Sequence, residues 1–257
     1  MKPLAGHHAL VTGANRGIGA AIARHLATAG ANVSLLVRTP TNAEPLVQAL
    51  EALGVRAVIV AADVTDAPAL ARAIGDAVAA LGPVDVLVNN AGTAETGPFH
   101  RSDDALFARM IGVHLMAPVH ATQAVLPAMV ARGRGRIVNI ASVAGLVGGP
   151  YVTAYTAAKH ALVGLTRALA VEYRNTGVLV NAVCPGYTDT EMIRGAVTQI
   201  VAKTGIATDA AVATILEDSG QRRFATTDEV ADATLAFALP SCTVTGETTL
   251  VMGESVT

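Results

Sequence analysis

Short apolar segments alternate with amphipathic, alanine-rich segments along the whole chain. Seven of these apolar segments are candidate strands, namely Ala9–Val11, Val33–Val37, Ala57–Val60, Val84–Val88, Ile137–Ile140, Val178–Val183 and Thr248–Val251. Continuous apolar strands that alternate with helices are typical of a parallel sheet covered on both faces. Because parallel crossovers are right-handed, the pattern predicts an α/β fold with a doubly wound sheet of about seven strands.

No linker, internal repeat or low-complexity stretch divides the chain, so we expect residues 1–257 to form one Rossmann-type domain. The alternation fails only at about 191–224, where two helical patterns follow each other without a strand between them. In an open α/β sheet, ligands bind beyond the carboxyl ends of the strands. We therefore interpret this segment as a helical substrate lid, with a peripheral packing insertion as the alternative.

Composition excludes several classes of protein. Hydrophobic residues make up 52% of the chain and charged residues 15%, which provides a large core. The net charge of −2 gives no general attraction to nucleic acid or to an anionic membrane, so neither is expected as a partner. Two stretches without charge, Met110–Ala131 and Ile137–Ala158, are long enough to span a bilayer. Histidine and proline interrupt the first and glycine the second, so we expect both to be buried in the fold.

Cys184 and Cys242 lie too far apart for a metal-ligand spacing, and no metal site is expected. The N-terminal residues contain no apolar signal core. We therefore expect a cytoplasmic protein with two reduced thiols.

A glycine-rich turn follows the first predicted strand. Residues Thr12–Gly19 carry the spacing Gly-x3-Gly-x-Gly and open a helix. Glycines let the backbone approach a pyrophosphate, and a helix N-terminus supplies free N–H groups and the positive end of a dipole. The cofactor contacts expected from this turn are Gly13, Asn15, Arg16, Gly17, Ile18 and Gly19. The spacing differs from the standard Gly-x-Gly-x-x-Gly, and such turns also serve packing.

The end of the second predicted strand bears on the choice of cofactor. Many NAD enzymes carry an acidic residue there, which binds the ribose 2′-hydroxyl, whereas this chain has Arg38. Together, Arg38 and Arg16 would clamp a 2′-phosphate, a dianion that an acid would repel. The expected cofactor is therefore NADP(H). NAD(H) remains the alternative if Arg38 is only a solvated surface residue.

A tyrosine, a lysine and a serine form the candidate catalytic set. Tyr155 and Lys159 share one face of a helix at i, i+4 spacing, and Ser142 follows the strand Ile137–Ile140. A free phenol is a poor base at neutral pH, and a neighbouring ammonium would lower its pKa. The Ser142 hydroxyl would bond a substrate oxygen without competing for the proton. Tyr-x3-Lys alone also arises by chance.

These motifs, with Asn89-Asn90-Ala91-Gly92 and Pro185-Gly186-x3-Thr190, resemble in order and spacing the compact branch of the short-chain dehydrogenase/reductases. The resemblance is to 3-oxoacyl reductases and 3-hydroxyacyl-CoA dehydrogenases. It implies hydride transfer between a nicotinamide and a carbonyl carbon, with Tyr155 as the acid/base. It also implies that Asn89 braces the central strands. The further cofactor contacts that it implies are Asp63, Val64, Asn90, Ala91, Gly92, Tyr155, Lys159, Pro185, Gly186, Thr188 and Thr190.

The chain departs from this family at His114, where relatives usually carry an asparagine that supports a water chain to the lysine. Histidine can also relay protons, so we include His114 in the catalytic set. A satisfied core histidine is the alternative.

The expected substrate is a 3-oxoacyl thioester or a similar medium-sized carbonyl compound, because the lid segment resembles such relatives. A wall of small or apolar residues is expected around it: Ala94, Thr96, Val143, Ala144, Val147, Tyr151, Tyr187 and Met192. Two alternatives remain, an NAD(H)-dependent hydroxyacyl-CoA or alcohol dehydrogenase and a catalytically silent partner subunit. The helix after Tyr155 is apolar on more than one face, which, with the resemblance, predicts a homotetramer.

Overall fold

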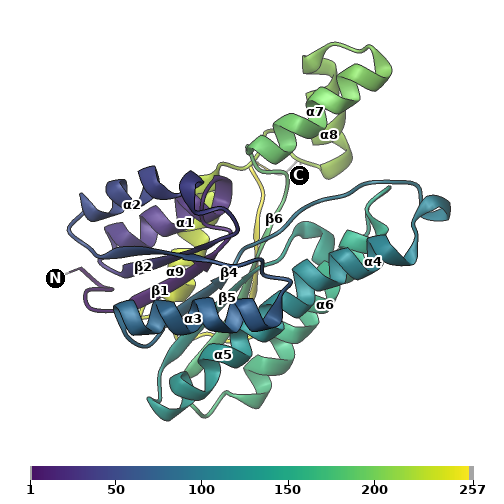
Figure 1. The fold of residues 1–257 in the computed structure, drawn as a ribbon. Helices are drawn as coiled ribbons and strands as arrows, with labels where there is room; N and C mark the ends of the chain where they lie inside the picture. Colours follow the sequence, from purple (N-terminus) through teal and green to yellow (C-terminus); the bar gives the residue numbers. More distant parts are fainter. Residues whose placement is uncertain (1, 255–257) are drawn as a thin grey trace.

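Seven parallel strands form one sheet in the computed structural model, which describes residues 2–254 (Figure 1). The strands are β1 (His8–Thr12), β2 (Asn32–Val37), β3 (Ala57–Ala61), β4 (Val86–Asn89), β5 (Gly135–Ile140), β6 (Val178–Pro185) and β7 (Thr248–Val251). Their order is β3-β2-β1-β4-β5-β6-β7, so the winding direction reverses between β1 and β4. The predicted α/β fold is confirmed, and each predicted strand overlaps an observed one.

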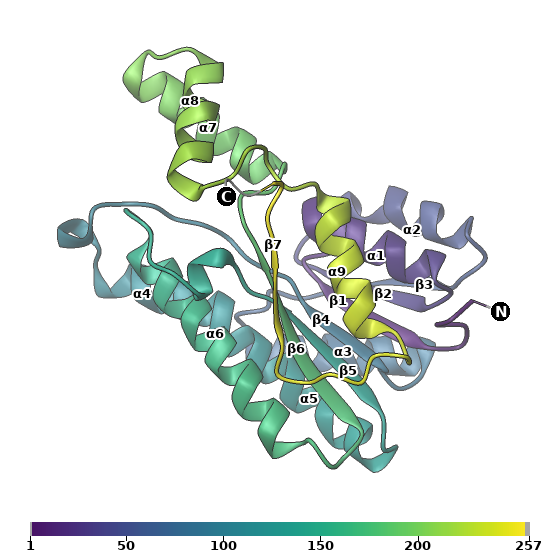
Figure 2. The ribbon, with the colours of Figure 1, turned by 180° about the vertical axis from the view of Figure 1, so that it is seen from behind.

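Helices cover both faces of the sheet. The α-helices of the described residues are α1 (Gly17–Thr28), α2 (Glu44–Glu51), α3 (Ala67–Leu81), α4 (Asp104–Ile111), α5 (Ala117–Ala131), α6 (Thr153–Glu172), α7 (Glu191–Thr204), α8 (Thr208–Ser219) and α9 (Thr227–Ala238). Helices α1, α2 and α9 lie on one face, and α3, α4, α5 and α6 lie on the other (Figures 1 and 2). This arrangement explains why the strand sequences are apolar at successive positions.

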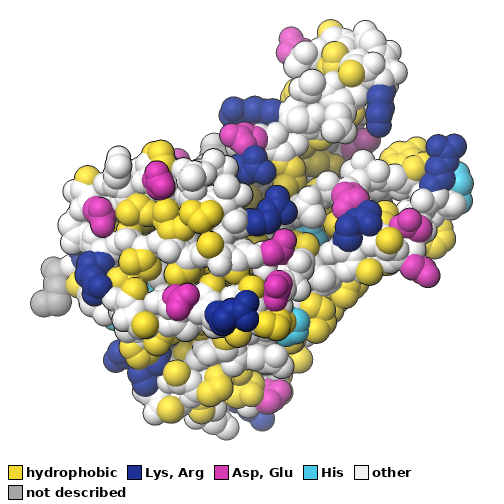
Figure 3. Space-filling model, viewed as in Figure 1, with side chains coloured by type: hydrophobic (Ala, Val, Ile, Leu, Met, Phe, Trp, Pro, Cys, Tyr) yellow, Lys and Arg dark blue, Asp and Glu magenta, His cyan; other side chains and the backbone are white. Residues whose placement is uncertain are grey.

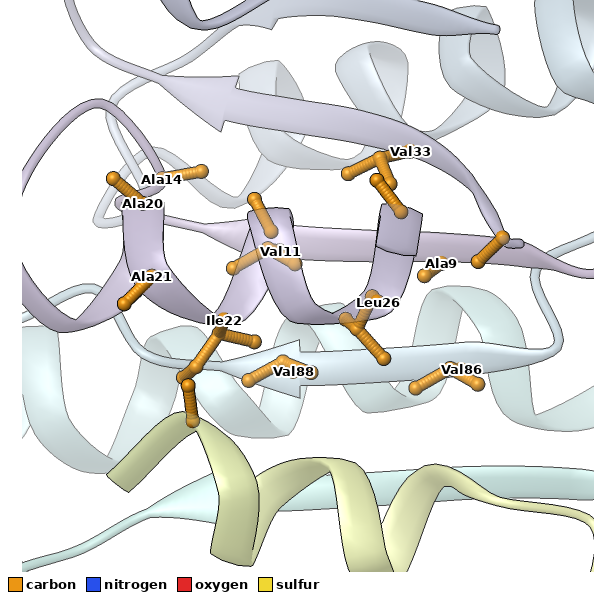
Figure 4. Packing of buried hydrophobic residues seen from close by; sticks show 14 of the residues in the cluster. Ala9, Val11, Ala14, Ala20, Ala21, Ile22, Leu26, Val33, Val86 and Val88 are labelled. Atoms are coloured by element: carbon orange, nitrogen blue, oxygen red, sulfur yellow. The ribbon is translucent and has the colours of Figure 1, made fainter. Parts of the chain in front are cut away.

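On the first face of the sheet, apolar residues spaced one turn apart on α1 build the core. Ile22 and Leu26 lie one turn apart on α1, and Figure 4 shows both packing onto valines of the central strands, among them Val11 and Val88. All four of these side chains are fully buried. Burial of each such side chain stabilises the fold by roughly 1.5–3 kcal/mol, so α1 is held firmly on β1 and β4. The loop that opens α1 therefore has a fixed position.

A chain of buried polar groups joins the second face to the sheet. The Asn89 side-chain amide donates to Asn139 Oδ1 at 2.8 Å, which connects β4 to β5. Asn139 Nδ2 donates in turn to Thr166 Oγ1 on α6, also at 2.8 Å. Because unpaired buried amides are costly, this chain fixes the rotation of α6 relative to the sheet.

Among residues 2–254, one helical stretch is long and apolar enough to span a membrane by composition, Asp104–Ala131, with a hydropathy of 1.2. It comprises α4, a π-helical turn η3 (Gly112–Met116) and α5. Here α5 packs against α3, and α4 packs against α6. The stretch is thus part of the layer over the sheet. Pro118 lacks an N–H donor, which accounts for the break in helical register at η3.

The segment expected to be a lid forms a helical hairpin that projects from the sheet (Figures 1 and 2). Helices α7 and α8 share a small core of their own, made by Ile193, Val197, Ala211 and Ile215. Backbone bonds join the two feet of the hairpin: Ala225 N donates to Tyr187 O at 2.9 Å, and Asp189 N donates to Ala225 O at 2.8 Å. The lid therefore leaves the sheet through a paired neck.

Replacing Asn139 by Leu should lower the free energy of unfolding by about 2–4 kcal/mol, because the buried groups of Asn89 and Thr166 each lose a hydrogen-bond partner at 2.8 Å. Urea denaturation measures this, with exposed Asn42→Leu as the control, expected within about 0.5 kcal/mol of the parent. Parent-like stability of Asn139→Leu would show that the polar chain does not hold α6.

Candidate active site

The glycine-rich loop between β1 and α1 lies at the point where the sheet reverses its winding direction. Gly13 and Gly17 have positive φ angles of 65° and 53°. A Cβ atom on Gly13 would come within 2.8 Å of Ala91 Cα, and one on Gly19 would overlap the Gly13 carbonyl. No side chain caps the N-terminus of α1. The free N–H groups of the first turn and the absence of side-chain atoms fit a pyrophosphate.

The loop after β4 is fixed to the loop after β1 by side-chain bonds. The Thr12 hydroxyl accepts from the N–H groups of Asn90 and Ala91 at 2.9 and 3.0 Å. The Asn90 amide donates to the carbonyls of Thr12 and Gly13 at 2.9 and 3.2 Å. The expected cofactor residues Asn90, Ala91 and Gly13 thus lie together as one surface, and side-chain hydrogen bonds from Thr12 and Asn90 maintain it.

Three predicted contacts for the adenosine end of the cofactor lie at the ends of two neighbouring strands. Arg38 follows β2 and is exposed; Asp63 and Val64 follow β3. Asp63 Oδ1 accepts from Thr65 Oγ1 at 2.7 Å and from Thr65 N at 2.9 Å, and these bonds, with the charge of Arg38, lower the pKa of Asp63. Asp63 is therefore a carboxylate hydrogen-bond acceptor at neutral pH.

The sequence predicted that Arg16 and Arg38 together bind a 2′-phosphate. In this structure the Arg16 side chain makes an ion pair with a residue of α7. Its Nη1 donates to Glu191 Oε2 at 2.8 Å, at the first residue of α7. Glu191 was not predicted as a site residue. Nothing in the sequence pattern marks Glu191 as a site residue, because acidic residues are common in the first turn of a helix.

Tyr155, Lys159 and Ser142 come together where β5 ends against α6. Lys159 is 4% exposed, its Nζ donates to the Ile140 carbonyl at 2.7 Å, and it lies 5.6 Å from the centroid of the Tyr155 ring. Ser142 precedes the short 3-10 turn η4 (Val143–Gly145), and its Oγ accepts from Ala144 N at 3.1 Å. A Cβ on Gly145 would lie 2.8 Å from the Lys159 carbonyl, so η4 packs directly on the catalytic helix.

The net shift of the Tyr155 pKa is opposite in direction to the one expected from a neighbouring ammonium. Burial raises the pKa of Tyr155, and its hydrogen bond with Ser142 opposes the rise only in part. Burial also lowers the pKa of Lys159 to about 7, so the ammonium is only partly populated at neutral pH. Tyr155 is thus a neutral phenol, which can donate a proton.

His114 lies in η3 beside Tyr155. The two rings meet edge to face, with centroids 5.0 Å apart and planes at 87°. His114 Nε2 is 2.7 Å from the Thr93 carbonyl, so it must carry the proton, and Nδ1 is buried without a partner among the described residues. Burial, together with the charge of Lys159, lowers the pKa of His114 to about 3. The ring stays neutral and its N–H is bonded to a backbone carbonyl. This geometry favours a positioning role over the predicted proton relay.

The predicted nicotinamide end follows β6. Pro185 and Thr188 are buried, Thr188 Oγ1 donates to Gly186 O at 3.1 Å, and Thr190 caps α7 through Ile193 N. Gln221, which was not predicted as a site residue, binds this loop from the opposite strand of the neck. Its Oε1 accepts from Tyr187 N at 2.8 Å, its Nε2 donates to Tyr187 O at 3.0 Å, and a Cβ on Gly186 would lie 2.6 Å from that Oε1. A single glutamine in the segment 191–224 gives no pattern from which to predict this.

Apolar side chains lie within the hollow beneath the projecting hairpin, and charged side chains lie along its edge (Figure 3). The exposed ones among the predicted substrate residues are Val147 (56%), Tyr151 (64%), Tyr187 (42%) and Met192 (54%). Ala94 and Thr96 are also exposed, and Val143 and Ala144 are half-buried. Tyr151 has a φ of 63°, and its carbonyl accepts from Gly97 N at 2.8 Å, which joins two loops at the mouth of the site. Backbone strain of this kind is often found at functional sites.

Comparison with known proteins agrees with this geometry. A family model described as short chain dehydrogenase matches residues 7–201. The oxidoreductase UcpA of Escherichia coli K12 is 46% identical over 193 residues, which cover 75% of this chain and 73% of UcpA.

Two solved structures extend the match over almost the whole chain. An actinorhodin polyketide ketoreductase variant with NADPH has a TM-score of 0.90 at 35% identity and covers 96% of each chain. A xylitol dehydrogenase with bound NAD+ has a TM-score of 0.91 at 28% identity and covers 98% of this chain and all of the other. With motifs, fold and relatives in agreement, the chain belongs to the short-chain dehydrogenase family of NAD(P)-binding oxidoreductases.

Proposed function

We propose that this oxidoreductase interconverts a ketone and a secondary alcohol, uses NADP(H), and takes a 3-oxoacyl thioester or an uncharged carbonyl compound of similar size. The observation that carries the proposal is the convergence of Ser142, Tyr155 and Lys159 beside the glycine-rich cradle. A catalytically silent subunit would not be expected to keep this arrangement.

In the proposed reaction, the bound nicotinamide cofactor supplies or accepts the hydride at the substrate carbon. The Ser142 hydroxyl bonds the substrate oxygen and holds it beside Tyr155. In reduction, Tyr155 Oη donates its proton to that oxygen, which a neutral phenol can do. Lys159 lies next to the tyrosine ring, and its ammonium would stabilise the phenolate left behind. His114 holds the ring of Tyr155 from the edge and fixes the Thr93 loop.

The arginines at the mouth of the site are already paired with carboxylates, which favours a substrate without a negative charge. Arg109 makes a two-point ion pair with Glu95, at 3.0 and 2.8 Å. Arg194 makes the same kind of pair with Asp189, at 2.9 and 3.0 Å. Both guanidinium groups therefore already have a carboxylate, which disfavours a small keto acid as substrate. Apolar walls favour an acyl chain or a ring instead.

The cofactor proposal rests on Arg38. Its exposed guanidinium at the end of β2 occupies the place where an acid would select NAD(H). The NADPH-bound relative shows that this fold takes NADP(H), and the NAD+-bound relative keeps NAD(H) as the alternative.

A row of small side chains on α6 supports the proposed homotetramer. Ala157, Ala161, Gly164, Ala168 and Val171 recur at helical spacing and are exposed or half-exposed, with Val171 64% exposed. An apolar stripe without large side chains lets a second helix approach closely, so a second copy of the chain is the proposed occupant.

Tyr155→Phe should reduce turnover at least ~100-fold while cofactor binding stays near that of the parent, because only the proton donor is removed. Ketone reduction followed at the nicotinamide absorbance, with cofactor affinity measured separately, tests this. Tyr173→Phe, at the far end of α6, is the control and should retain activity. Substantial turnover by Tyr155→Phe would refute the catalytic assignment.

The kcat/KM with NADP(H) should exceed that with NAD(H) by at least ~10-fold, since one charge-assisted bond to the 2′-phosphate supplies about that factor. Arg38→Asp should shift the preference towards NAD(H), because a carboxylate repels the phosphate and can bind the 2′-hydroxyl. Both cofactors are compared in parent and variant against plain ketones and 3-oxoacyl thioesters. A parent that prefers NADH would mean that Arg38 is only a solvated surface residue.

Light scattering at micromolar concentration should give the mass of four chains, and Ala168→Arg should reduce it, because a long charged side chain cannot pack in the stripe. Asp76→Arg, on exposed α3 surface, is the matched control and should leave the mass unchanged. A monomeric parent contradicts the proposed assembly.

A further inference from the structure

The lid and the cofactor loop are joined by one ion pair. Arg16 Nη1 and Glu191 Oε2 are 2.8 Å apart, and the two side chains are 70% and 68% exposed. The neck of the hairpin comprises residues 187–190 and 220–225. Among residues 2–254, this is the only ion pair or side-chain hydrogen bond that links segment 191–219 to any residue beyond the neck. The backbones are close as well: a Cβ on Gly17 would lie 3.5 Å from Thr190 Cγ2.

We propose that Glu191 is a determinant of cofactor selectivity: its carboxylate competes with the cofactor 2′-phosphate for the Arg16 guanidinium. This inference rests on the proposed preference for NADP(H). Arg16 lies at the N-cap of α1, on the loop that fits the dinucleotide. An open groove beside the pair is lined by this loop and α1, by the start of α7 and by the start of α9, and it includes the charged residues Arg24, Asp189, Arg194 and Asp228. With NADP(H) bound, Arg16 would therefore have two anions to pair with, the Glu191 carboxylate and the 2′-phosphate.

Arg16 binds the phosphate more strongly than the carboxylate, but the phosphate must first displace Glu191. An exposed carboxylate–guanidinium pair contributes little stability, because water screens both charges. A phosphate presents a double charge and three acceptor oxygens to the planar guanidinium. The phosphate therefore displaces Glu191, but the affinity gained is smaller than an unpaired Arg16 would give. NAD(H), which has a hydroxyl at this position, leaves the pair intact.

Displacement also releases the lid. The neck at residues 187–190 and 220–225 keeps its own bonds, including those from Gln221, and α7 and α8 keep their shared core. When Arg16 leaves Glu191, the hairpin can move as a unit about the neck. Cofactors with a 2′-phosphate thus loosen the lid, and those without it do not.

Binding of two small ligands separates this effect from catalysis. Adenosine 2′,5′-bisphosphate and 5′-AMP differ only in the 2′-phosphate, and calorimetry gives the affinity of each. Glu191→Gln should tighten the bisphosphate by about fivefold, the factor expected when an exposed ion pair no longer competes, and change 5′-AMP less than about twofold. Glu217→Gln on α8 is the control, because this exposed carboxylate makes no ion pair within the described residues, and it should change neither ligand.

A second pair of variants tests whether the effect acts through Arg16. In an Arg16→Gln background, Glu191→Gln should no longer affect bisphosphate affinity. Hydrogen exchange gives an independent readout: the bisphosphate should speed amide exchange in residues 191–219 of the parent, and 5′-AMP should not. Glu191→Gln should show the faster exchange without any ligand.

Equal tightening of both ligands, or no tightening of either, overturns the proposal, as does slower exchange of the lid with the bisphosphate. Failure of the proposed NADP(H) preference gives a different result from failure of the Glu191 proposal. If the parent enzyme prefers NADH, the NADP(H) assignment is wrong; if it prefers NADPH and Glu191→Gln leaves bisphosphate affinity unchanged, only the competition for Arg16 is wrong.

Discussion

The hydrogen-bond chain from Asn89 through Asn139 to Thr166 is the interaction on which the site depends. It lies buried in the centre of the sheet, where an unpaired amide is costly. The chain fixes the rotation of α6, and in that rotation Lys159 reaches the carboxyl end of β5, where its Nζ donates to the Ile140 carbonyl. Apolar packing alone would hold the helix against the sheet without specifying which of its faces meets the substrate.

A second set of bonds places the cofactor surface against this helix. The Thr12 hydroxyl and the Asn90 amide connect the loops after β1 and β4, the two strands between which the winding direction reverses. Both loops are therefore rigid before any ligand binds, which reduces the entropy lost on binding. The lid differs, because it joins the body through its neck and one exposed ion pair. The cofactor loops are thus fixed to each other by several hydrogen bonds, whereas outside its neck the α7–α8 hairpin is tied to the body of the described fold by a single ion pair.

The fold was predictable from sequence because its strands are buried on both faces and read as continuous apolar runs. Only strand ends shifted, as at β4, which begins at Val86 where the pattern predicted Val84. The glycine positions and the grouping of Ser142, Tyr155 and Lys159 were also predictable, since motif order along the chain encodes them. The rest depends on contacts between distant residues: Gln221 at the neck, Glu191 on Arg16, and the burial that sets the pKa values of Tyr155 and His114. The i, i+4 spacing of Tyr155 and Lys159 does not show how deeply the two side chains are buried, so the effect of desolvation on their pKa values could not be predicted from it.

Transfer of a label tests the central claim, that this geometry delivers hydride from a nicotinamide to a carbonyl carbon. The enzyme is incubated with NADPH carrying deuterium at both C4 positions and with a panel of uncharged ketones and 3-oxoacyl thioesters, and the alcohol products are analysed by mass spectrometry. The account predicts one deuterium in the alcohol product, on the carbinol carbon. Alcohol formed without deuterium, or no alcohol from any member of the panel, would contradict it.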